Sequence, residues 1–412
     1  MKKVLSIAAA FALILSLSVT SVFAAAIGTG VVESSDTTIT IPKGVTFINE
    51  DAVTSNGPGI TFSYTVAPAS VTAGQYTVKD ADGHITSVNP GPAAGLSLDA
   101  STLTFGANET FTTSAAGVEA TKNLSLSVDT SAFTKPGVYR YVITDTTAKA
   151  DLFAAGITRD DNYQTTRFID VFIKRDASNN FVVAGYALKT TNDSTDGSTN
   201  PATPKDPGFV SSSDVEDGTP ADTDRYETYN VTVTKQVAGT MGDVEHEFPF
   251  AITVANQGKA FKSAKGNVAT ASAATAATTT ALSTPLKHGE TYTIVGLSPK
   301  ATFSVVETND TTDLYTVTVA GSSQAIQVTE NASAKTYSIA AGAVSTYDTD
   351  NSASSVNELG DETNYSAVTY TNTLDEVSPT GLVLRYGPFM ILFAAALVIL
   401  AASKHSDAQD AK

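Results

Sequence analysis

The side chains that most often carry enzyme chemistry are few and scattered in this chain. Its 4 histidines lie far apart and lack the spacing of metal ligands. No serine, histidine and aspartate occur in the setting of a nucleophile elbow, and no glycine-rich phosphate loop precedes a helix. Two acidic runs, residues 214–217 and 222–224, lack the spacing of a calcium-binding loop. We therefore expect no enzyme activity, no cofactor and no metal.

Composition narrows the class of protein further. The 412 residues carry a net charge of −17, which argues against a nucleic-acid partner because phosphates require lysine and arginine. The chain has no cysteine, so disulfides cannot stabilise it. Its length allows two domains of ordinary size.

Polar and apolar residues alternate along much of the chain, as they do in half-buried strands. The clearest stretches are 38–41, 62–66, 124–128, 248–254 and 291–295. Residues 168–173 and 181–183 flank a polar tip and predict a hairpin. Between the two ends of the chain, no stretch keeps a helical period with caps. The pattern predicts an all-β protein made of β-sandwich domains.

The N-terminus is typical of an export signal. Lys2 and Lys3 precede the apolar stretch 4–19, and Val22 and Ala24 supply the small residues of a signal-peptidase site. We expect residues 1–24 to be a signal peptide that is removed after Ala24.

Near the C-terminus, the stretch Val377-Ser378-Pro379-Thr380-Gly381 precedes an almost wholly apolar run, 386–402, and a polar tail. This order resembles the cell-wall sorting signal of Gram-positive surface proteins. The resemblance implies that a sortase cleaves after Thr380 and joins the Thr380 carbonyl to an amine. The apolar run is short for a spanning helix of about 20 residues. We therefore expect it to be a transmembrane helix that only transiently anchors the chain, ahead of a cytoplasmic tail.

Composition divides the remaining chain into parts. Residues 27–190 form a predicted N-terminal β-sandwich. An acidic stretch rich in serine, threonine and proline, residues 191–225, is predicted to be an exposed linker or loop. Residues 226–376 form a second predicted domain, and 377–412 hold the sorting signal.

The second domain contains three recognisable motifs. They are Tyr229–Lys235, Phe303–Glu307 and Val368–Thr373. In this order they resemble the isopeptide-forming domain of Gram-positive pilins, the streptococcal pilin isopeptide-linkage family, which is related to collagen-adhesin B-type repeats. The resemblance covers residues 226–376 and implies tandem immunoglobulin-like or collagen-adhesin-B-type sandwiches.

The same resemblance implies a covalent bond between Lys235 and Asn372, assisted by Glu307. Burial lowers the pKa of a lysine and raises that of a glutamate, so both side chains can be neutral together. A neutral amine is a nucleophile, and a protonated carboxyl can polarise an amide carbonyl. Proximity would then replace an external enzyme.

The first domain shows a looser version of the same plan. Residues 39–43 could form a first strand that carries a bonding Lys43, and 136–145 resemble a pilin segment with Asp145 in the place of the assisting glutamate. Asn192 would then be the bonding partner. A Lys43–Asn192 bond and a domain without a cross-link both remain open.

A polymerising pilin also needs an exposed lysine that accepts the next subunit. Lys205 lies in a short Pro-Lys-Asp-Pro stretch that weakly resembles a pilin motif, and Lys189 at a strand end is the alternative.

Together these features predict a structural subunit of a covalent pilus on the surface of a Gram-positive bacterium. Its predicted partners are a sortase, other copies of the chain and minor pilins, and the host ligand is left open. The alternative is a wall-anchored adhesin that displays a ligand-binding N-terminal domain and does not polymerise.

Overall fold

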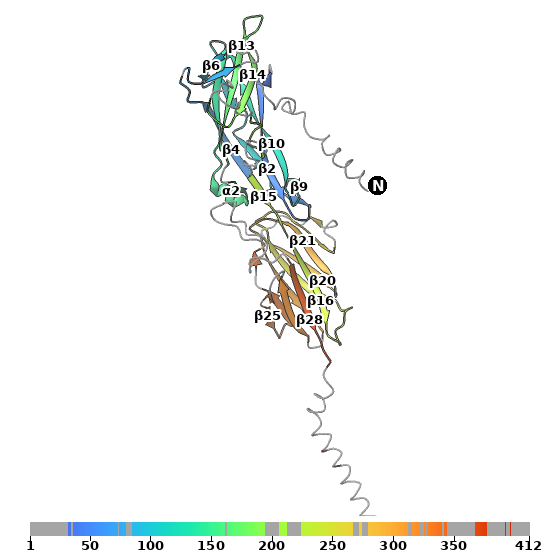
Figure 1. The fold of residues 1–412 in the computed structure, drawn as a ribbon. Coiled ribbons are helices and arrows are strands. Elements are labelled where there is room, and N and C mark those ends of the chain that lie inside the picture. Colours follow the sequence, from blue (N-terminus) through green and yellow to red (C-terminus); the bar gives the residue numbers. More distant parts are fainter. Residues whose placement is uncertain are drawn as a thin grey trace, which may run out of the picture.

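The computed structural model confirms the predicted all-β architecture. It describes residues 32–33, 36–72, 74–79, 85–160, 163–193, 206–211, 224–266, 272–273, 279–311, 315–321, 325–326, 328–339, 342–343 and 367–376, and positions 392 and 396. Within them, two groups of sheets lie end to end along an elongated molecule (Figure 1). The predicted signal peptide lies outside the described residues, as does the predicted sorting signal except for positions 392 and 396.

The sheets of the first group enclose one apolar core. One sheet has the order β1 (Val32–Glu33), β14 (Phe181–Lys189), β13 (Thr166–Arg175), β11 (Gly137–Asp145), β4 (Ile60–Pro68) and β8 (Thr102–Phe105), with β6 (Ile85–Pro90) on β11 and β5 (Thr77–Lys79) on β6. The facing sheet has the order β12 (Thr158–Arg159), β15 (Asp224–Glu227), β2 (Thr38–Ile48), β10 (Val118–Val128) and β7 (Leu96–Leu98). A small sheet pairs β3 (Thr54–Asn56) with β9 (Thr110–Thr112).

The sequence pattern of β2 explains its position in this core. Ile39, Ile41, Val45 and Phe47 are all buried, because alternate residues of a strand point to the same face. Lys43 falls in the same register and is therefore carried into the core with them.

The predicted hairpin is confirmed. β13 and β14 pair antiparallel around the 176–180 tip, with a register shift between Phe172 and Ile173. Asp176 shapes the tip because its carboxylate accepts a hydrogen bond from the backbone N–H of Asn180.

The second group forms another sandwich. One sheet has the order β19 (Ser272–Ala273), β18 (Lys262–Lys265), β21 (Thr291–Leu297), β16 (Tyr229–Ala238), β28 (Ala367–Thr373), β23 (Thr316–Gly321) and β24 (Ala325–Ile326). The other has the order β20 (Thr280–Leu286), β17 (Phe248–Ala255), β22 (Thr302–Thr308), β26 (Thr336–Ile339) and β25 (Val328–Asn331), with β27 (Gly342–Ala343) on β22. A second apolar core lies between these sheets.

Within the stretch 191–225, the described residues 206–211 and Asp224 are buried or half-buried, unlike the exposed linker that the composition predicts. Phe209 is fully buried in the first core, and its backbone bonds to Pro42 and Gly44 of β2. At the end of the stretch, β15 pairs with β2, and only Thr228 separates β15 from β16. The composition was misleading because a few buried side chains, Phe209 and Val210 with Asp206 paired to Arg167, anchor an otherwise polar segment.

A short helix, α2 (Lys149–Ala155), was not predicted by the sequence pattern. Gly156 ends it in the left-handed conformation, with its N–H bonded to carbonyls of the last turn. A 3-10 turn, η1 (Thr130–Ala132), follows β10. Across the described part of the chain, neither segment has the length and apolar character that crossing a membrane requires.

Candidate functional site

Three polar side chains meet inside the second sandwich. Lys235 on β16, Glu307 on β22 and Asn372 on β28 are each 0% exposed. β16 and β28 are parallel neighbours in one sheet, with Lys235 opposite Tyr370 and Asn372 opposite Val237. Because residues two apart share a face, Lys235 and Asn372 point to the same side, toward the sheet that carries Glu307.

Glu307 contacts both of the other two side chains. The Lys235 Nζ lies 3.2 Å from each carboxylate oxygen of Glu307, and the Asn372 Nδ2 donates to Glu307 Oε1 at 2.5 Å. The structure thus brings together the three residues that the motifs pointed to, with the glutamate bridging the lysine and the asparagine.

Aromatic side chains keep this site dry. The Lys235 Nζ lies 4.1 Å from the ring centroid of Phe248, and Phe250 packs edge-on against Tyr370 at 5.2 Å. The Tyr370 hydroxyl donates its hydrogen bond to the Val305 carbonyl, so it does not donate to Lys235, Glu307 or Asn372. Such surroundings disfavour any charged group that is not paired.

The pKa values follow from this burial. Burial lowers the pKa of Lys235 to about 8, although the nearby Glu307 opposes the shift. Burial likewise raises the pKa of Glu307, against the opposing effects of Lys235 and Asn372. Both shifts favour the neutral amine and the protonated acid, which is the state that amide chemistry between these side chains requires.

The Asn372 side chain has one unused polar atom. Its Oδ1 is buried and has no hydrogen-bond partner among the described residues. A 180° rotation of the amide exchanges Oδ1 and Nδ2, and would place Oδ1 beside Glu307. A protonated Glu307 could then donate to Oδ1 and polarise the carbonyl for attack.

The first sandwich buries a different cluster around Lys43. The Lys43 Nζ contacts the Asp224 carboxylate and lies 3.0 Å from the Tyr163 hydroxyl. Tyr163 in turn donates to Asp145, at 2.9 Å. Arg159 completes the cluster with hydrogen bonds to Asp224 at 2.7 and 2.8 Å and to Asp145 at 2.9 Å.

Of the two alternatives left open for the first domain, the structure does not bring Lys43 and Asn192 together. Asn192 follows β14, which lies in the opposite sheet from β2, and its side chain bonds to Arg140 and to the Ser70 carbonyl. β15 instead pairs directly with β2 and brings Asp224 to Lys43. Asp145 does lie in the same cluster, linked to Lys43 through Tyr163.

Charge in the Lys43 cluster is balanced. Burial opposes ionisation of Asp224, but Lys43 and Arg159 outweigh it and hold the pKa of Asp224 below its usual value. Burial lowers the pKa of Lys43 despite the attraction of Asp224. Two basic and two acidic side chains therefore share the cluster, and Asp224 is held as an anion by the Arg159 fork.

Asp224, Arg159 and Tyr163 were missed at the sequence level. No motif marks them, and Asp224 lies in the stretch that was taken for a linker. The one sequence feature that could have indicated Asp224 is its position, as an acidic residue at the start of a short strand directly before the second domain.

The structure describes only one of the two lysines that were predicted to accept the next subunit. Lys205 lies outside the described residues. The Lys189 side chain is completely buried and contacts Asp193, so it lacks the exposure that an acceptor lysine needs.

The described residues contain no group of three or more histidine, cysteine, aspartate or glutamate side chains that could hold a metal ion.

No curated protein matches the sequence. Residues 229–374 match a family model. It is described as a domain of unknown function, DUF7601.

Several solved structures are similar in fold. The major pilin from Streptococcus pyogenes is 17% identical, and the match covers 83% of this chain and 100% of the pilin, with a TM-score of 0.41. The major pilin T3.2 from Streptococcus pyogenes is 18% identical over 82% of this chain and 100% of that one, with a TM-score of 0.38. A pilus-presented adhesin, Spy0125 (Cpa), is 12% identical over 82% and 99%, with a TM-score of 0.23. At such scores a neighbour carries no functional argument, so we take the function from the residues of this chain.

Proposed function

We propose that this chain is a structural subunit of a covalently polymerised surface pilus, and that its second domain forms an internal Lys235–Asn372 isopeptide bond. The observation that carries the proposal is the bridging position of Glu307 between a buried amine and a buried amide. A surface or ion-pair role for Lys235 would not require an asparagine on the same carboxylate.

The proposed reaction uses the three side chains as follows. The neutral amine of Lys235 attacks the Asn372 side-chain carbonyl carbon while Glu307 donates a proton to its oxygen. Glu307 then carries a proton from the Lys235 nitrogen to the Asn372 nitrogen. The original carbon–nitrogen bond of the Asn372 amide breaks, and ammonia leaves. The primary amide of Asn372 becomes a secondary amide with Lys235, one ammonia is lost, and Glu307 ends as it began.

For the first domain we propose an ion-pair network without a cross-link. An anionic carboxylate is a poor acyl donor, and the Arg159 fork holds Asp224 in that form. Lys43 and Asp224 would therefore stabilise the fold only while both remain charged and paired.

Intact-mass spectrometry of the mature ectodomain, residues 25–376, tests both statements. We expect a mass one ammonia below the calculated value. Glu307→Ala and the matched Glu307→Gln should both restore the full mass, because neither can shuttle the proton. A wild-type protein at full mass would refute the Lys235–Asn372 bond, and an additional loss of one water would refute the uncross-linked first domain.

We propose that assembly proceeds through Thr380, with the chain exported and attached to a Gram-positive surface by a sortase. Its own activity would be limited to the single internal bond, with no external substrate. Detergent-resistant ladders in cell-wall extracts, lost in Thr380→Ala, are the expected result. A wild-type chain that is wall-attached as a single copy would instead favour the non-polymerising adhesin.

A further inference from the structure

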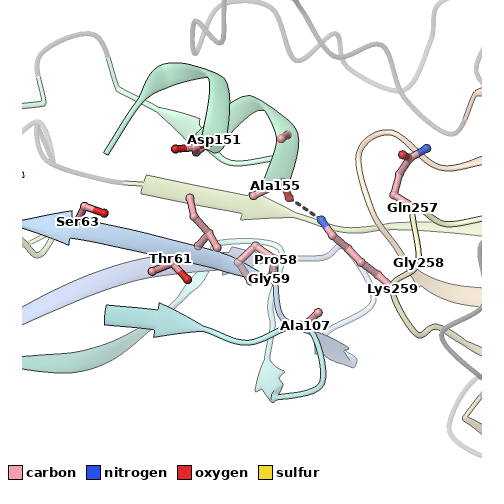
Figure 2. Close-up of a pocket in the computed structure, with 12 residues that line it drawn as sticks. Pro58, Gly59, Thr61, Ser63, Ala107, Asp151, Ala155, Gln257, Gly258 and Lys259 are labelled. Carbon is pink, nitrogen blue, oxygen red and sulfur yellow. Dashed lines mark hydrogen bonds between the residues drawn. The ribbon is translucent and has the colours of Figure 1, made fainter. Parts of the chain in front are cut away.

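Two side chains of the second domain hydrogen-bond to backbone groups at the ends of regular elements, where helix and strand partners run out. Lys259, in the loop between β17 and β18, crosses a cavity of about 600 Å³ at the junction of the two sandwiches. Its Nζ donates at 2.5 Å to the carbonyl of Ala155, the last residue of α2 (Figure 2). That contact belongs to the junction between the domains. His288 makes a comparable contact on β16, the strand that carries Lys235.

β16 extends beyond one of its two neighbouring strands. It lies between β21 and β28 in its sheet. Its ladder with β21 ends at Thr234, whereas its ladder with β28 continues to Ala238. Beyond Thr234, a turn at residues 287–290 takes the place of β21. The backbone N–H and carbonyl of Lys235 both bond to this turn, at 3.0 and 2.8 Å.

The next backbone group on the same edge of β16 is the N–H of Val237. It donates to Nδ1 of His288 at 2.9 Å. A side chain here replaces the carbonyl that a neighbouring strand supplies elsewhere in the ladder. As an acceptor, Nδ1 carries no proton, so the imidazole in this contact is neutral with its proton on Nε2.

The turn holds the imidazole in place. The Glu290 N–H donates to the Lys287 carbonyl at 3.0 Å, and the Glu290 carboxylate accepts from the Lys287 N–H at 2.7 Å. Gly289 has a φ of +77°, which the third residue of a type II turn requires. His288 is the second residue of this turn, so its side chain projects from a fixed backbone toward β16.

Val237 connects this contact to the two residues proposed to react. It lies directly opposite Asn372 in the parallel ladder and two residues after Lys235, with its side chain on the same face. The hydrogen bond to His288 therefore fixes the part of β16 that sets the distance between the Lys235 amine and the Asn372 amide. A misplacement of about 1 Å can slow a reaction on the order of 100-fold.

We propose that His288 is a positioning residue for the formation of the Lys235–Asn372 bond. It acts through the backbone of Val237 and takes no part in the proton transfers, which remain those of Glu307. The inference rests on the proposed isopeptide bond and adds to it a residue outside the reacting group.

Two substitutions separate the hydrogen bond from the rest of the side chain. His288→Asn keeps an acceptor, because asparagine Oδ1 is the same number of bonds from the backbone as histidine Nδ1. His288→Leu has similar branching but no acceptor. Lys287→Leu is the matched control in the same turn, since the Lys287 ammonium pairs with the exposed Glu245.

The rate of bond formation is measured on the mature chain, residues 25–376, made by cell-free synthesis. Synthesis is stopped, samples are quenched in acidic denaturant at intervals, and intact-mass spectrometry gives the fraction that has lost ammonia. Each His288 substitution is repeated together with Glu307→Gln, which blocks the bond, so that the gain of protease resistance reports folding alone.

We expect His288→Leu to slow ammonia loss by roughly 10-fold while folding at the wild-type rate. His288→Asn and Lys287→Leu should both lose ammonia as fast as the wild type. Hydrogen exchange of the Val237 N–H should be faster in His288→Leu and protected again in His288→Asn.

Three results would overturn the positioning role while leaving the bond itself intact. They are a wild-type rate in His288→Leu, no rescue by His288→Asn, and folding that slows by the same factor as ammonia loss. A wild-type chain that never loses ammonia would instead refute the Lys235–Asn372 bond, and the role of His288 with it.

Discussion

Replacing Asn372 by alanine should remove the internal bond while leaving the Lys235–Glu307 pair in place. The two bonded residues are 137 positions apart (372 − 235). Closing a loop of this length restricts the unfolded chain by about 5 kcal/mol in the chain-entropy treatment of cross-links. For a domain of this size, each kcal/mol shifts the melting temperature by roughly 2–4 °C, so we expect a decrease of roughly 10–20 °C.

Differential scanning calorimetry of the ectodomain, with intact-mass spectrometry of the same samples, measures this effect. Glu307→Gln should show a similar decrease, because it retains both Lys235 and Asn372 but blocks the proton transfer. Asn123→Ala, an exposed asparagine on β10, is the matched control and should melt as the wild type does. If Asn372→Ala melts within about 2 °C of a cross-linked wild type, the loop-closure reasoning is refuted.

Two further predictions concern the first domain. Asp224→Ala leaves Lys43 and Arg159 without this shared anion, and should lower the free energy of unfolding by about 3–5 kcal/mol in urea titrations at neutral pH. The folded-state pKa of Asp224 is lowered, so its contribution to the free energy of unfolding should be complete above its unfolded pKa of about 4. That contribution should be lost as the pH falls through the folded-state pKa. An acid unfolding transition that is equally steep in Asp224→Ala would contradict this prediction. Phe209→Ala should cost about 3–5 kcal/mol by opening a cavity beside β2, whereas a loss below about 1 kcal/mol would show that the segment 206–211 does not anchor there.

Local alternation was enough to predict the all-β fold, because strands such as β2 and β10 bury one face and expose the other. The hairpin of β13 and β14 was predictable for the same reason, with a turn-forming tip between two apolar runs. α2 was missed because seven residues hold too few turns for a helical period, and only Gly156 marked its end.

The two buried clusters differ in how well the sequence predicted them. Lys235, Glu307 and Asn372 each lie in a motif, so their order along the chain indicated their meeting. Asp224 lies in no motif. Its contact with Lys43 depends on the parallel pairing of β15 with β2, two strands separated in sequence by almost the whole first domain. Asn192 was one open alternative because it follows a predicted strand, but the sequence does not indicate which sheet that strand joins.

The single residue between β15 and β16 also affects the order in which the chain can fold. Protein chains are synthesised from the N-terminus, and β2 receives its neighbour β15 only after some 180 further residues have emerged. The sheet that contains β2 is complete only when the chain has reached residue 227, and the next residues already begin the second sandwich. β16 must in turn wait for β28. Both sandwiches therefore receive their last described strand late in synthesis, the first when just over half of the chain has been made and the second only near residue 373.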